Sequence, residues 1–557
     1  MPKDYFNEFL PDLEEFQEKT IQFHKGDISV AEYKRFSGGF GSYAQRGGRK
    51  HMLRLRMAGG RLTKERLKFI AESLDKYEIG RLKMTTCQSI QLHDLEAGQL
   101  CALMKEAWQA GMISRGGGGD FPRNVMATPL SGLQKEEYFD VMPYAVAAGE
   151  YLMGFIKAAK FPRKLKVCFS SRPENETHAT FRDLGFVAGP NRTFDIYAAG
   201  GLGIKPSLGI CVARDISPDK ILYYIKAMVE TFVAYGNYEN RARSRTRFMA
   251  EELGEDGFRK AYLEKLEEIF ALHAGKAAVS SRSGETLELS EYTVSEEYQE
   301  AVRPVTKQKS PVKSHILSDK RIVPQKQEGL YAVFYQPTGG MLTPAQVIRL
   351  YHLIKPMEDV GIRLTPEEGL YVVNCSAAEA EEILSATKDS ARTLFETSVA
   401  CVGASVCQVG IGDSQTLLNA CIERVRREGF SDGVLPQIHI SGCPSSCGTH
   451  QIGKVGFRGG IRQTPDGPRP AFAIFTGGCP VQGKEVLADM GKSILAEDIP
   501  EFLAELGRMV EKEGMLYEEW AERYPEKLEK IIEKYTGGRQ YGCIYNPEGR
   551  QLYIVAL

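Results

Sequence analysis

RLRMAGGRLTKERLKFIAESLDKYEIGRLKMTTCQSIQ, residues 54–91, carries most of the information about the fold because the chain contains this pattern twice. It aligns without a gap with FYQPTGGMLTPAQVIRLYHLIKPMEDVGIRLTPEEGLY, residues 334–371, at a constant separation of 280 positions. Gly59-Gly60 then matches Gly339-Gly340, and Thr85 matches Thr365. Each copy predicts a strand, a Gly-Gly turn, an amphipathic helix and another strand.

A second repeat follows each copy at a separation of 271 positions. It pairs Val167 with Ile438, Ser170 with Ser441, and Pro173 with Pro444, each set at the end of an apolar strand pattern. The chain is therefore built from two halves of similar plan. We predict an α+β fold of two pseudo-symmetric halves, each a ferredoxin-like α/β unit followed by a larger mixed α/β domain.

The repeat and the changes in composition also predict domain boundaries. The expected parts are an N-terminal arm (1–50), a ferredoxin-like unit (51–120), a mixed domain (121–290), a linker (291–327), the second ferredoxin-like unit (328–395) and the second mixed domain (396–557). A site would form where the halves meet. The linker is polar and contains basic residues that either dock an acidic partner or face solvent, and the solvated linker is the preferred interpretation: Lys307, Lys309, Lys313, Lys320 and Arg321.

Charge and hydropathy limit the possible partners. The 71 Lys and Arg residues balance 72 Asp and Glu residues, so no global charge favours nucleic acid or an anionic membrane. The most apolar long stretch, residues 141–159, contains Glu150 and Lys157 and predicts a core helix rather than a membrane span. The N-terminal residues lack a signal or transit pattern, which predicts a cytoplasmic protein. Its 12 cysteines are then expected to be reduced, and clustered ones to bind metal.

Four cysteines lie in two closely spaced pairs, Cys401-x5-Cys407 and Cys443-x3-Cys447, within glycine-rich sequence. Four thiolates are the ligand number of one [4Fe–4S] cluster. A structural zinc site is the second interpretation, although its cysteines are usually closer than the x5 spacing. Unliganded core cysteines are the third. Cys421 has helical spacing with apolar neighbours and is expected in the core.

Basic residues recur on two predicted strands. Arg54 and Arg56 alternate with apolar residues along one strand, and Lys164 and Lys166 do so along the other. Each basic pair should therefore occupy one face of its strand. Arg123 follows a glycine-rich loop. Such residues often face solvent. Convergent Arg and Lys side chains would instead bind an oxyanion or a cofactor with several carboxylates, with Arg as the clamp and Lys as the proton donor.

These residues resemble the siroheme nitrite and sulfite reductases, of the single-chain ferredoxin-dependent type, over nearly the whole chain. The matching segments are GSYAQR (41–46), MLRLRMAGG (52–60), FPRNV (121–125), FPRKLK (161–166), PQKQEGL (324–330), C-x5-C, GCPSSCG (442–448) and IGKVGF (452–457). The resemblance implies a siroheme whose iron shares the Cys447 sulfur with a [4Fe–4S] cluster held by all four cysteines. It also implies that Arg54, Arg123, Lys164 and Lys166 contact the bound anion, and that Arg56, Gln91 and Arg163 hold siroheme carboxylates.

The resemblance further implies six-electron reduction of a small inorganic anion, with electrons from ferredoxin or another reduced carrier. No nucleotide or flavin motif is evident in the sequence. Lys166, where similar nitrite reductases usually carry Asn, favours sulfite over nitrite as substrate, and nitrite is the alternative. Cys87 replaces a common Arg, which puts one siroheme contact in doubt, and Ser445 replaces a common Asn. An iron–sulfur electron-transfer protein without siroheme is the more distant alternative.

Overall fold

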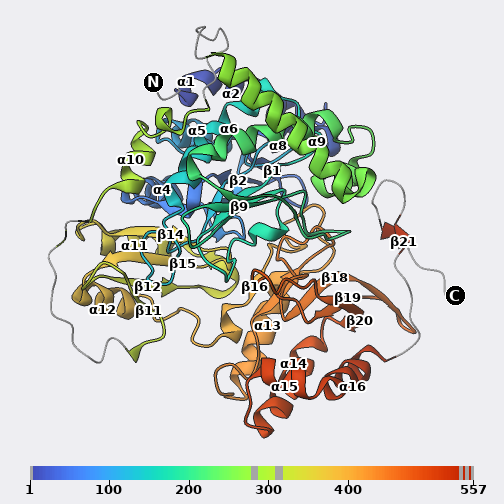
Figure 1. The fold of residues 1–557 in the computed structure, drawn as a ribbon. Coiled ribbons are helices and arrows are strands. Elements are labelled where there is room, and N and C mark those ends of the chain that lie inside the picture. The colour runs from blue at the N-terminus through green and yellow to red at the C-terminus, as the bar shows by residue number, and fades with distance from the viewer. Residues whose placement is uncertain are drawn as a thin grey trace.

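The computed structural model describes residues 4–276, 287–305, 307, 318–537, 544–545 and 551–552. The described residues form four five-stranded sheets and one two-stranded ribbon, β21 (Ile544–Tyr545) with β22 (Gln551–Leu552). Two sheets belong to each half of the chain. Figure 1 shows the first half, blue to green, stacked on the second half, yellow to red.

The first sheet of each half has the same strand order. In half one it is β1-β2-β5-β4-β13, and in half two it is β11-β12-β15-β14-β3. The bounds are β1 Ser42–Ala44, β2 His51–Leu55, β3 Arg61–Leu62, β4 Leu82–Met84, β5 Ile90–Leu95, β11 Ile322–Pro324, β12 Tyr331–Tyr335, β13 Met341–Leu342, β14 Gly361–Leu364 and β15 Leu370–Cys375. Each half therefore donates its short strand after the Gly-Gly turn to the other half's sheet, where β3 pairs with β14 and β13 with β4.

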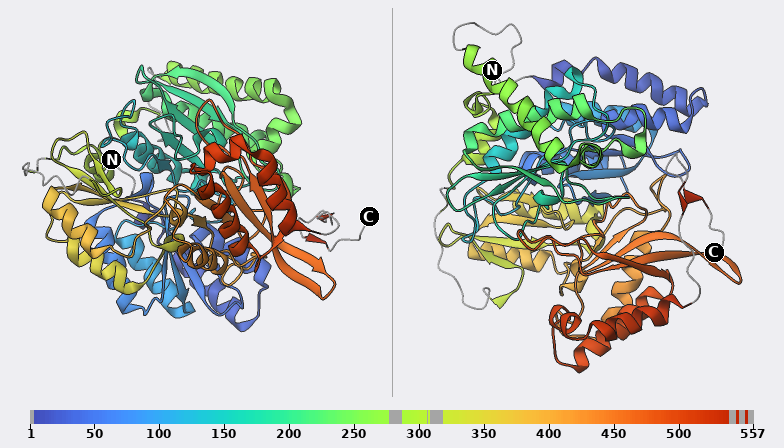
Figure 2. Two further views of the ribbon diagram at one scale, coloured as in Figure 1. Left: turned by 90° about the horizontal axis from the view of Figure 1, so that it is seen from below. Right: turned by 45° about the vertical axis from the view of Figure 1, so that its right-hand side comes forward.

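Equivalent helices cover these two sheets. Thr63 caps α4 (Lys64–Lys76) by accepting a hydrogen bond from the Arg66 N–H, and Thr343 caps α11 (Pro344–Ile354) in the same way. Helices α5 (Ala97–Gln109) and α12 (Ala377–Ala386) follow β5 and β15. One apolar core runs through both units, which Figure 2 shows side by side in blue and yellow. The repeat thus predicted the correct order of elements.

The Gly-Gly turns let the two halves approach closely. Gly60 has φ +70°, and a Cβ there would lie 2.8 Å from the Leu364 carbonyl oxygen. Gly340 has φ +67°, and its Cβ would lie 2.7 Å from Cβ of Glu368 and 3.0 Å from the Met84 carbonyl oxygen. Only glycine has both the left-handed backbone and the missing side chain that these crossings need.

The second sheet of each half also has one plan, with two parallel pairings followed by two antiparallel ones. In half one it contains β6 (Met126–Ala127), β7 (Val167–Ser170), β8 (Leu184–Ala188), β9 (Phe194–Ala198) and β10 (Ile210–Ile216). In half two it contains β16 (Val399–Ala400), β17 (Ile438–Ser441), β18 (Val455–Thr464), β19 (Gly467–Thr476) and β20 (Asp489–Leu495). The predicted α+β fold of two pseudo-symmetric halves is confirmed.

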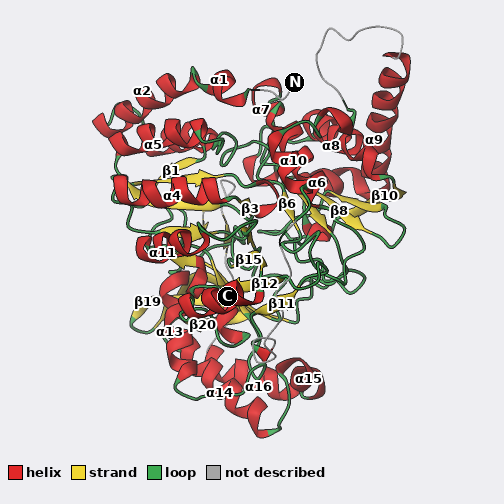
Figure 3. Ribbon diagram, turned by 90° about the vertical axis from the view of Figure 1, so that its left-hand side faces the viewer, coloured by secondary structure: helices red, strands yellow, loops and turns green. Residues whose placement is uncertain are grey.

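Helices pack on the outer faces of these sheets. Half one uses α6 (Met142–Met153), α7 (Phe155–Ala158), α8 (Ile221–Tyr235) and α9 (Thr246–Lys276), and half two uses α13 (Ser414–Arg426), α14 (Ile499–Lys512), α15 (Tyr517–Arg523) and α16 (Pro525–Thr536). Figure 3 shows α14–α16 at the end of the molecule opposite the N-terminal helices α1 (Tyr5–Phe9) and α2 (Asp12–Lys25), which α3 (Val30–Ser37) follows. The core helix expected over residues 141–159 is confirmed as α6 and α7. None of the described helices combines the length and the apolar character that a membrane crossing needs.

Two local expectations were wrong. The strand expected from Lys164 to Cys168 begins only at Val167. Leu165 forms an isolated parallel bridge to Pro122, and the register changes by one residue before Met126 pairs with Cys168, which interrupts the ladder. The linker is not simply solvated. It contains α10 (Glu296–Val302), whose Glu297 pairs with the half-buried Arg66 at 3.0 Å.

The basic residues of the linker are also largely accounted for. Lys307 forms an ion pair with Glu379, and the Lys307 side chain is 11% exposed. Lys320 pairs with Asp432 at 2.7 Å. Arg321 donates to the Thr387 carbonyl oxygen. The other two, Lys309 and Lys313, lie outside the described residues. The exact boundaries of the domains stay a prediction.

Candidate anion and cluster site

Asn124 ties together three segments that carry the predicted cations. Its amide nitrogen donates to the carbonyl oxygens of Met57, Cys87 and Gln88 at 2.8–3.0 Å, and its oxygen accepts from the Met57 N–H. The end of β2, the turn between β4 and β5, and the loop with Arg123 are therefore fixed to one another. Asn124 belongs to the FPRNV segment, but this role depends on contacts between distant segments that the sequence alone does not reveal.

Arg54 and Gln91 lie opposite each other on β2 and β5. With the Gln91 amide oxygen turned toward Arg54, it accepts from Arg54 Nε at 3.0 Å while the amide nitrogen donates to Nε2 of His93 at 3.1 Å. Arg54 also donates to the Gly117 carbonyl oxygen at 2.8 Å. Burial lowers the pKa of His93 to about 3, so its ring stays neutral and can accept this hydrogen bond.

Arg56 and Arg123 are held by backbone carbonyls of the glycine-rich loop. Arg123 donates to the carbonyl oxygens of Gly117 and Gly119, and Arg56 donates to those of Arg115, Pro122 and Arg123 itself. Burial lowers the pKa of each guanidinium to about 10, which leaves both charged at neutral pH. Nε of Arg123 is buried without a partner, so this arginine retains a donor for a ligand.

Lys164 and Lys166 precede β7 on a segment that pairs with the Arg123 loop, since the Arg123 N–H donates to the Leu165 carbonyl oxygen at 2.8 Å. Burial, together with the charges of neighbouring cations, lowers the pKa of both lysines. The Lys166 ammonium donates to the Cys87 sulfur at 3.3 Å. A bound anion would offset the repulsion among these cations and raise both pKa values again.

The positive charges of this site also change the pKa of Cys87. Burial alone would raise the pKa of its thiol, but the charges of Lys166 and Arg182 outweigh burial and lower the pKa to about 6. Where the family usually carries a cation, this chain therefore places a side chain that is largely a thiolate at neutral pH. The net positive charge of the site is correspondingly smaller.

Further arginines reach this site that the sequence analysis missed. Arg245 pairs with the buried carboxylate of Asp183 at 2.9 Å, and Asp183 also accepts from the Lys166 backbone N–H. Arg247 has two N–H groups, on Nε and Nη1, that are buried without a partner. Arg163 pairs with Asp120 at 2.8 Å and so is already occupied. The alternation of four arginines in 241–247, RARSRTR, was the signal that could have revealed them.

The four predicted cysteines lie on loops that half two folds tightly together. The Gly442 N–H donates to the Cys401 sulfur at 3.1 Å, and a Cβ on Gly442 would lie 2.5 Å from the Gly412 carbonyl oxygen. Burial, followed by the charge of Cys447, raises the pKa of Cys401 to about 12 and also raises that of Cys443. The thiols of these two loops are therefore near neighbours. Cys447 is the exposed member of the set, and Cys421 is fully buried, as expected.

Half one holds the cysteine loops in place across the molecule. The Arg46 guanidinium donates to the carbonyl oxygens of Gly410 and Cys407 at 2.6 and 3.3 Å. The Arg46 backbone N–H donates to the Val406 carbonyl oxygen. Thr86, next to Cys87, donates to the Cys447 carbonyl oxygen at 2.8 Å. The charge of Cys447 acts on the Lys166 ammonium. The structure thus brings the cations of half one and the cysteines of half two into one site.

This arrangement fits the cofactors that the resemblance implies. Within the described part of the chain, no three Cys, His, Asp or Glu side chains converge closely enough to hold a single metal ion. The four cysteines on the two facing loops match the number of thiolate ligands that one [4Fe–4S] cluster takes. The unpartnered buried donors of Arg247 suit the carboxylates of a siroheme, and that of Arg123 suits a bound anion, because a buried donor without a partner costs folding free energy.

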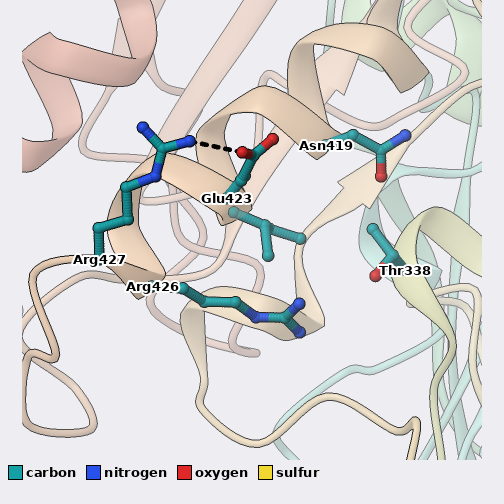
Figure 4. A pocket seen from close by; sticks show the side chains of 6 residues that line it. Thr338, Asn419, Glu423, Arg426 and Arg427 are labelled. Atoms are coloured by element: carbon teal, nitrogen blue, oxygen red, sulfur yellow. Dashed lines mark hydrogen bonds and ion pairs between the residues drawn. The ribbon is translucent and has the colours of Figure 1, made fainter.

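A separate surface hollow of about 340 Å³ lies beside α13 and contains none of the predicted site residues. Figure 4 shows its charged side chains, in which Arg427 is paired with Glu423. Arg426 is paired with Glu396 at 2.6 Å. These charges already have partners, so the hollow offers no comparable chemistry.

The chain is similar in sequence to known reductases. It matches the family model for the nitrite and sulphite reductase 4Fe-4S domain over residues 118–270 and the model for the nitrite/sulfite reductase ferredoxin-like half domain over residues 43–109 and 323–390. It is 26% identical to an assimilatory ferredoxin-dependent nitrite reductase of Haloferax mediterranei, over 92% of this chain and 88% of that protein. It is 27% identical to a chloroplastic ferredoxin–nitrite reductase of Zea mays, over 84% and 80% of the two chains.

The fold is also similar to a solved structure. The Mycobacterium tuberculosis NirA protein superposes with a TM-score of 0.71 at 20% identity, over 89% of this chain and 91% of that one. The two family models together cover just over half of the chain, in the same repeated order as the structure. The chain belongs to the nitrite and sulfite reductase family, single-chain ferredoxin type, whose cofactors are siroheme and a [4Fe–4S] cluster.

Proposed function

We propose that the protein reduces nitrite to ammonia in a six-electron reaction, in the cytoplasm, with reduced ferredoxin as the electron donor. The observation that carries this proposal is the group of half-buried cations beside the cysteine loops: Arg54, Arg123, Lys164 and Lys166. The choice of nitrite and ferredoxin is supported by the relatives, which are named ferredoxin-dependent nitrite reductases.

In this proposal the cofactors supply the electrons, and the side chains supply charge and protons. Arg54 and Arg123 hold the anion, since a guanidinium stays charged, and Nε of Arg123 is a buried donor without a protein partner. Lys164 and Lys166 donate protons as oxygen leaves as water, because burial lowers the pKa of each ammonium and so makes it a readier proton donor.

Arg56, Gln91 and Arg163 would hold the carboxylates of the siroheme, Cys401, Cys407, Cys443 and Cys447 would hold the cluster, and Cys447 would also contact the siroheme. Arg56 and Arg163 already have backbone or acidic partners, so we add Arg247, whose two unpartnered N–H groups support the same role.

Sulfite is the second candidate substrate, and Lys166 favours it. A second ammonium in the pocket stabilises a dianion more than a monoanion. The neighbouring Cys87 weakens this preference, because its thiolate form offsets part of the Lys166 charge at a distance of 3.3 Å. The names of the relatives and this pairing both support nitrite over sulfite.

The test is a side-by-side assay of nitrite and sulfite with reduced ferredoxin, on protein whose siroheme content is measured by absorption. We expect a higher kcat/KM for nitrite and the release of ammonia. A higher kcat/KM for sulfite would select the second candidate instead. If the protein carries the cluster but no siroheme and reduces neither anion, the proposal is wrong, and the protein is an iron–sulfur electron-transfer protein instead.

A further inference from the structure

A second cavity, of about 210 Å³, lies between the halves and away from the cysteines. Its wall is formed by β12, β15 and the loops after β6 and β7. The lining residues are Pro129, Leu130, Glu176, Phe334, Gln336, Thr365, Glu367, Tyr371, Thr397 and Gln437.

This cavity is the pseudo-symmetric image of the anion and cluster site. At the separation of 280 positions, five of its lining residues correspond to residues of that site: Phe334 to Arg54, Gln336 to Arg56, Thr365 to Thr85, Glu367 to Cys87 and Tyr371 to Gln91. At the separation of 271 positions, Gln437 corresponds to Lys166 and Glu176 to Cys447. The fold therefore builds the same cavity twice, with different side chains.

The side chains of the second cavity have the opposite polarity. Where the first site has Arg54, Arg56 and Lys166, the second has an aromatic ring and two amides, and Glu176 stands at the position of the cluster ligand. Oε2 of Glu176 is buried without a hydrogen-bond partner. So is Oε1 of Gln336, whose side chain is fully buried and whose Nε2 donates to the carbonyl oxygens of Glu367 and Thr397.

Two unpartnered buried acceptors are costly unless a donor reaches them. Phe334 and Tyr371 add aromatic faces beside them, with ring centroids 5.0 Å apart and planes inclined by 43°. Carboxylate and amide oxygens next to aromatic faces are the surroundings that an N–H-bearing cation prefers. A volume of about 210 Å³ exceeds that of a bare ion and is suited to a small organic cation.

We propose that this cavity binds a small protonated amine, with Glu176, Glu367 and Gln336 accepting its N–H groups and Phe334 and Tyr371 packing against its carbon atoms. The proposal rests on the cavity and its unpartnered acceptors, and it is independent of which anion the enzyme reduces.

Binding should strengthen as the pH rises. Burial, and then the nearby Glu176, raises the pKa of Glu367 to about 7. The other charged or titratable groups that act on these two carboxyls are Arg172, which lies 3.3 Å from Glu176, Tyr371, Glu137 and Glu174. Because a cation favours the ionised carboxylates, its affinity is greatest above the pKa of Glu367.

The experiment is calorimetric titration of the holoenzyme with methylammonium chloride, and separately with potassium chloride and tetramethylammonium chloride, which have no N–H donor. We expect saturable binding of methylammonium, affinity at least tenfold weaker for the other two cations, and tighter binding at about pH 8 than at about pH 6. Absence of saturable binding, or equal affinity for all three cations, would overturn the proposal.

Glu367→Gln and Glu176→Gln each preserve shape and remove one charge, and each should weaken methylammonium binding at least tenfold. Glu65→Gln, at an exposed position on α4, is the matched control and should bind as the unchanged protein does. Siroheme absorption reports whether each variant is folded. If a variant fails to fold, the comparison of the three cations on the unchanged protein still tests the proposal. If both Gln variants fold and bind methylammonium with unchanged affinity, the proposed site is wrong.

Discussion

At the scale of single residues, Lys166 and Cys87 set the charge that an anion meets. Their side chains lie 3.3 Å apart, and the low pKa of the thiol depends mainly on the ammonium. The resemblance to the family implies a change from Arg to Cys at position 87, but it does not reveal that the thiol pairs with Lys166. That contact depends on β7 being placed against the β4–β5 turn, which the sequence of either segment does not specify.

Lys166→Asn should shift the preference of the enzyme toward nitrite. At an effective dielectric constant of about 20, a pair of unit charges about 4 Å apart contributes about 4 kcal/mol, so losing one cation costs a dianion more than a monoanion. We expect the ratio of kcat/KM for sulfite to that for nitrite to fall roughly tenfold or more. Lys160→Asn, at an exposed position, is the control. An unchanged ratio in Lys166→Asn would exclude Lys166 as the selector.

At the scale of elements, a buried ion pair joins β4 of half one to the β14–β15 turn of half two. Lys83 and Glu368 lie 2.9 Å apart with side chains 2% exposed, and Lys83 also donates to the Gly339 carbonyl oxygen at 2.6 Å. Glu368 accepts from the Ala400 N–H of β16. Gln88 corresponds to Glu368 at the separation of 280 positions, and its side-chain oxygen likewise accepts a hydrogen bond from the Ala127 N–H of β6. The repeat predicted these elements, but not that polar side chains fasten them together.

Lys83→Met should destabilise the protein by about 3–5 kcal/mol, because it leaves Glu368 buried without its partner. Burial already raises the pKa of Glu368 to about 7 despite the nearby Lys83. Without Lys83 the carboxyl takes up a proton more readily, and a neutral carboxyl is cheaper to bury. The loss measured by urea unfolding should therefore be larger at about pH 8 than at about pH 6.

The matched control for that experiment is the double variant Lys83→Met with Glu368→Gln. The amide removes the unpaired charge and can still accept from the Ala400 N–H. We expect it to recover part of the stability and to remove the dependence on pH. A single variant as stable as the unchanged protein, or one whose loss is the same at both pH values, would contradict the role given to this pair.

At the scale of the whole molecule, the sequence predicted the twofold plan because the repeats have constant separations and recognisable turns. It did not predict that β3 and β13 exchange between the sheets, because each strand is only 2 residues long and its partners are 258 or more positions away. The cysteine ligands could be predicted because the two cysteines of each pair are close together in the sequence. Arg245, Arg247 and the second cavity were missed because they depend on contacts between distant segments.

The exchange of strands gives the last prediction. Gly340→Ala would place a methyl group 2.7–3.0 Å from Glu368 and from the Met84 carbonyl oxygen, where two backbones cross between the halves. Gly429→Ala is the matched control, since Gly429 has a similar φ of +71° and nothing within 4 Å of its Cβ position. Both variants suffer the strain of a left-handed alanine, about 1–2 kcal/mol. Only Gly340→Ala should lose further stability and retain less siroheme, because it pushes apart the halves that form the site. Thermal unfolding and siroheme absorption of the two variants measure this difference, and equal losses would mean that the crossing does not hold the halves together.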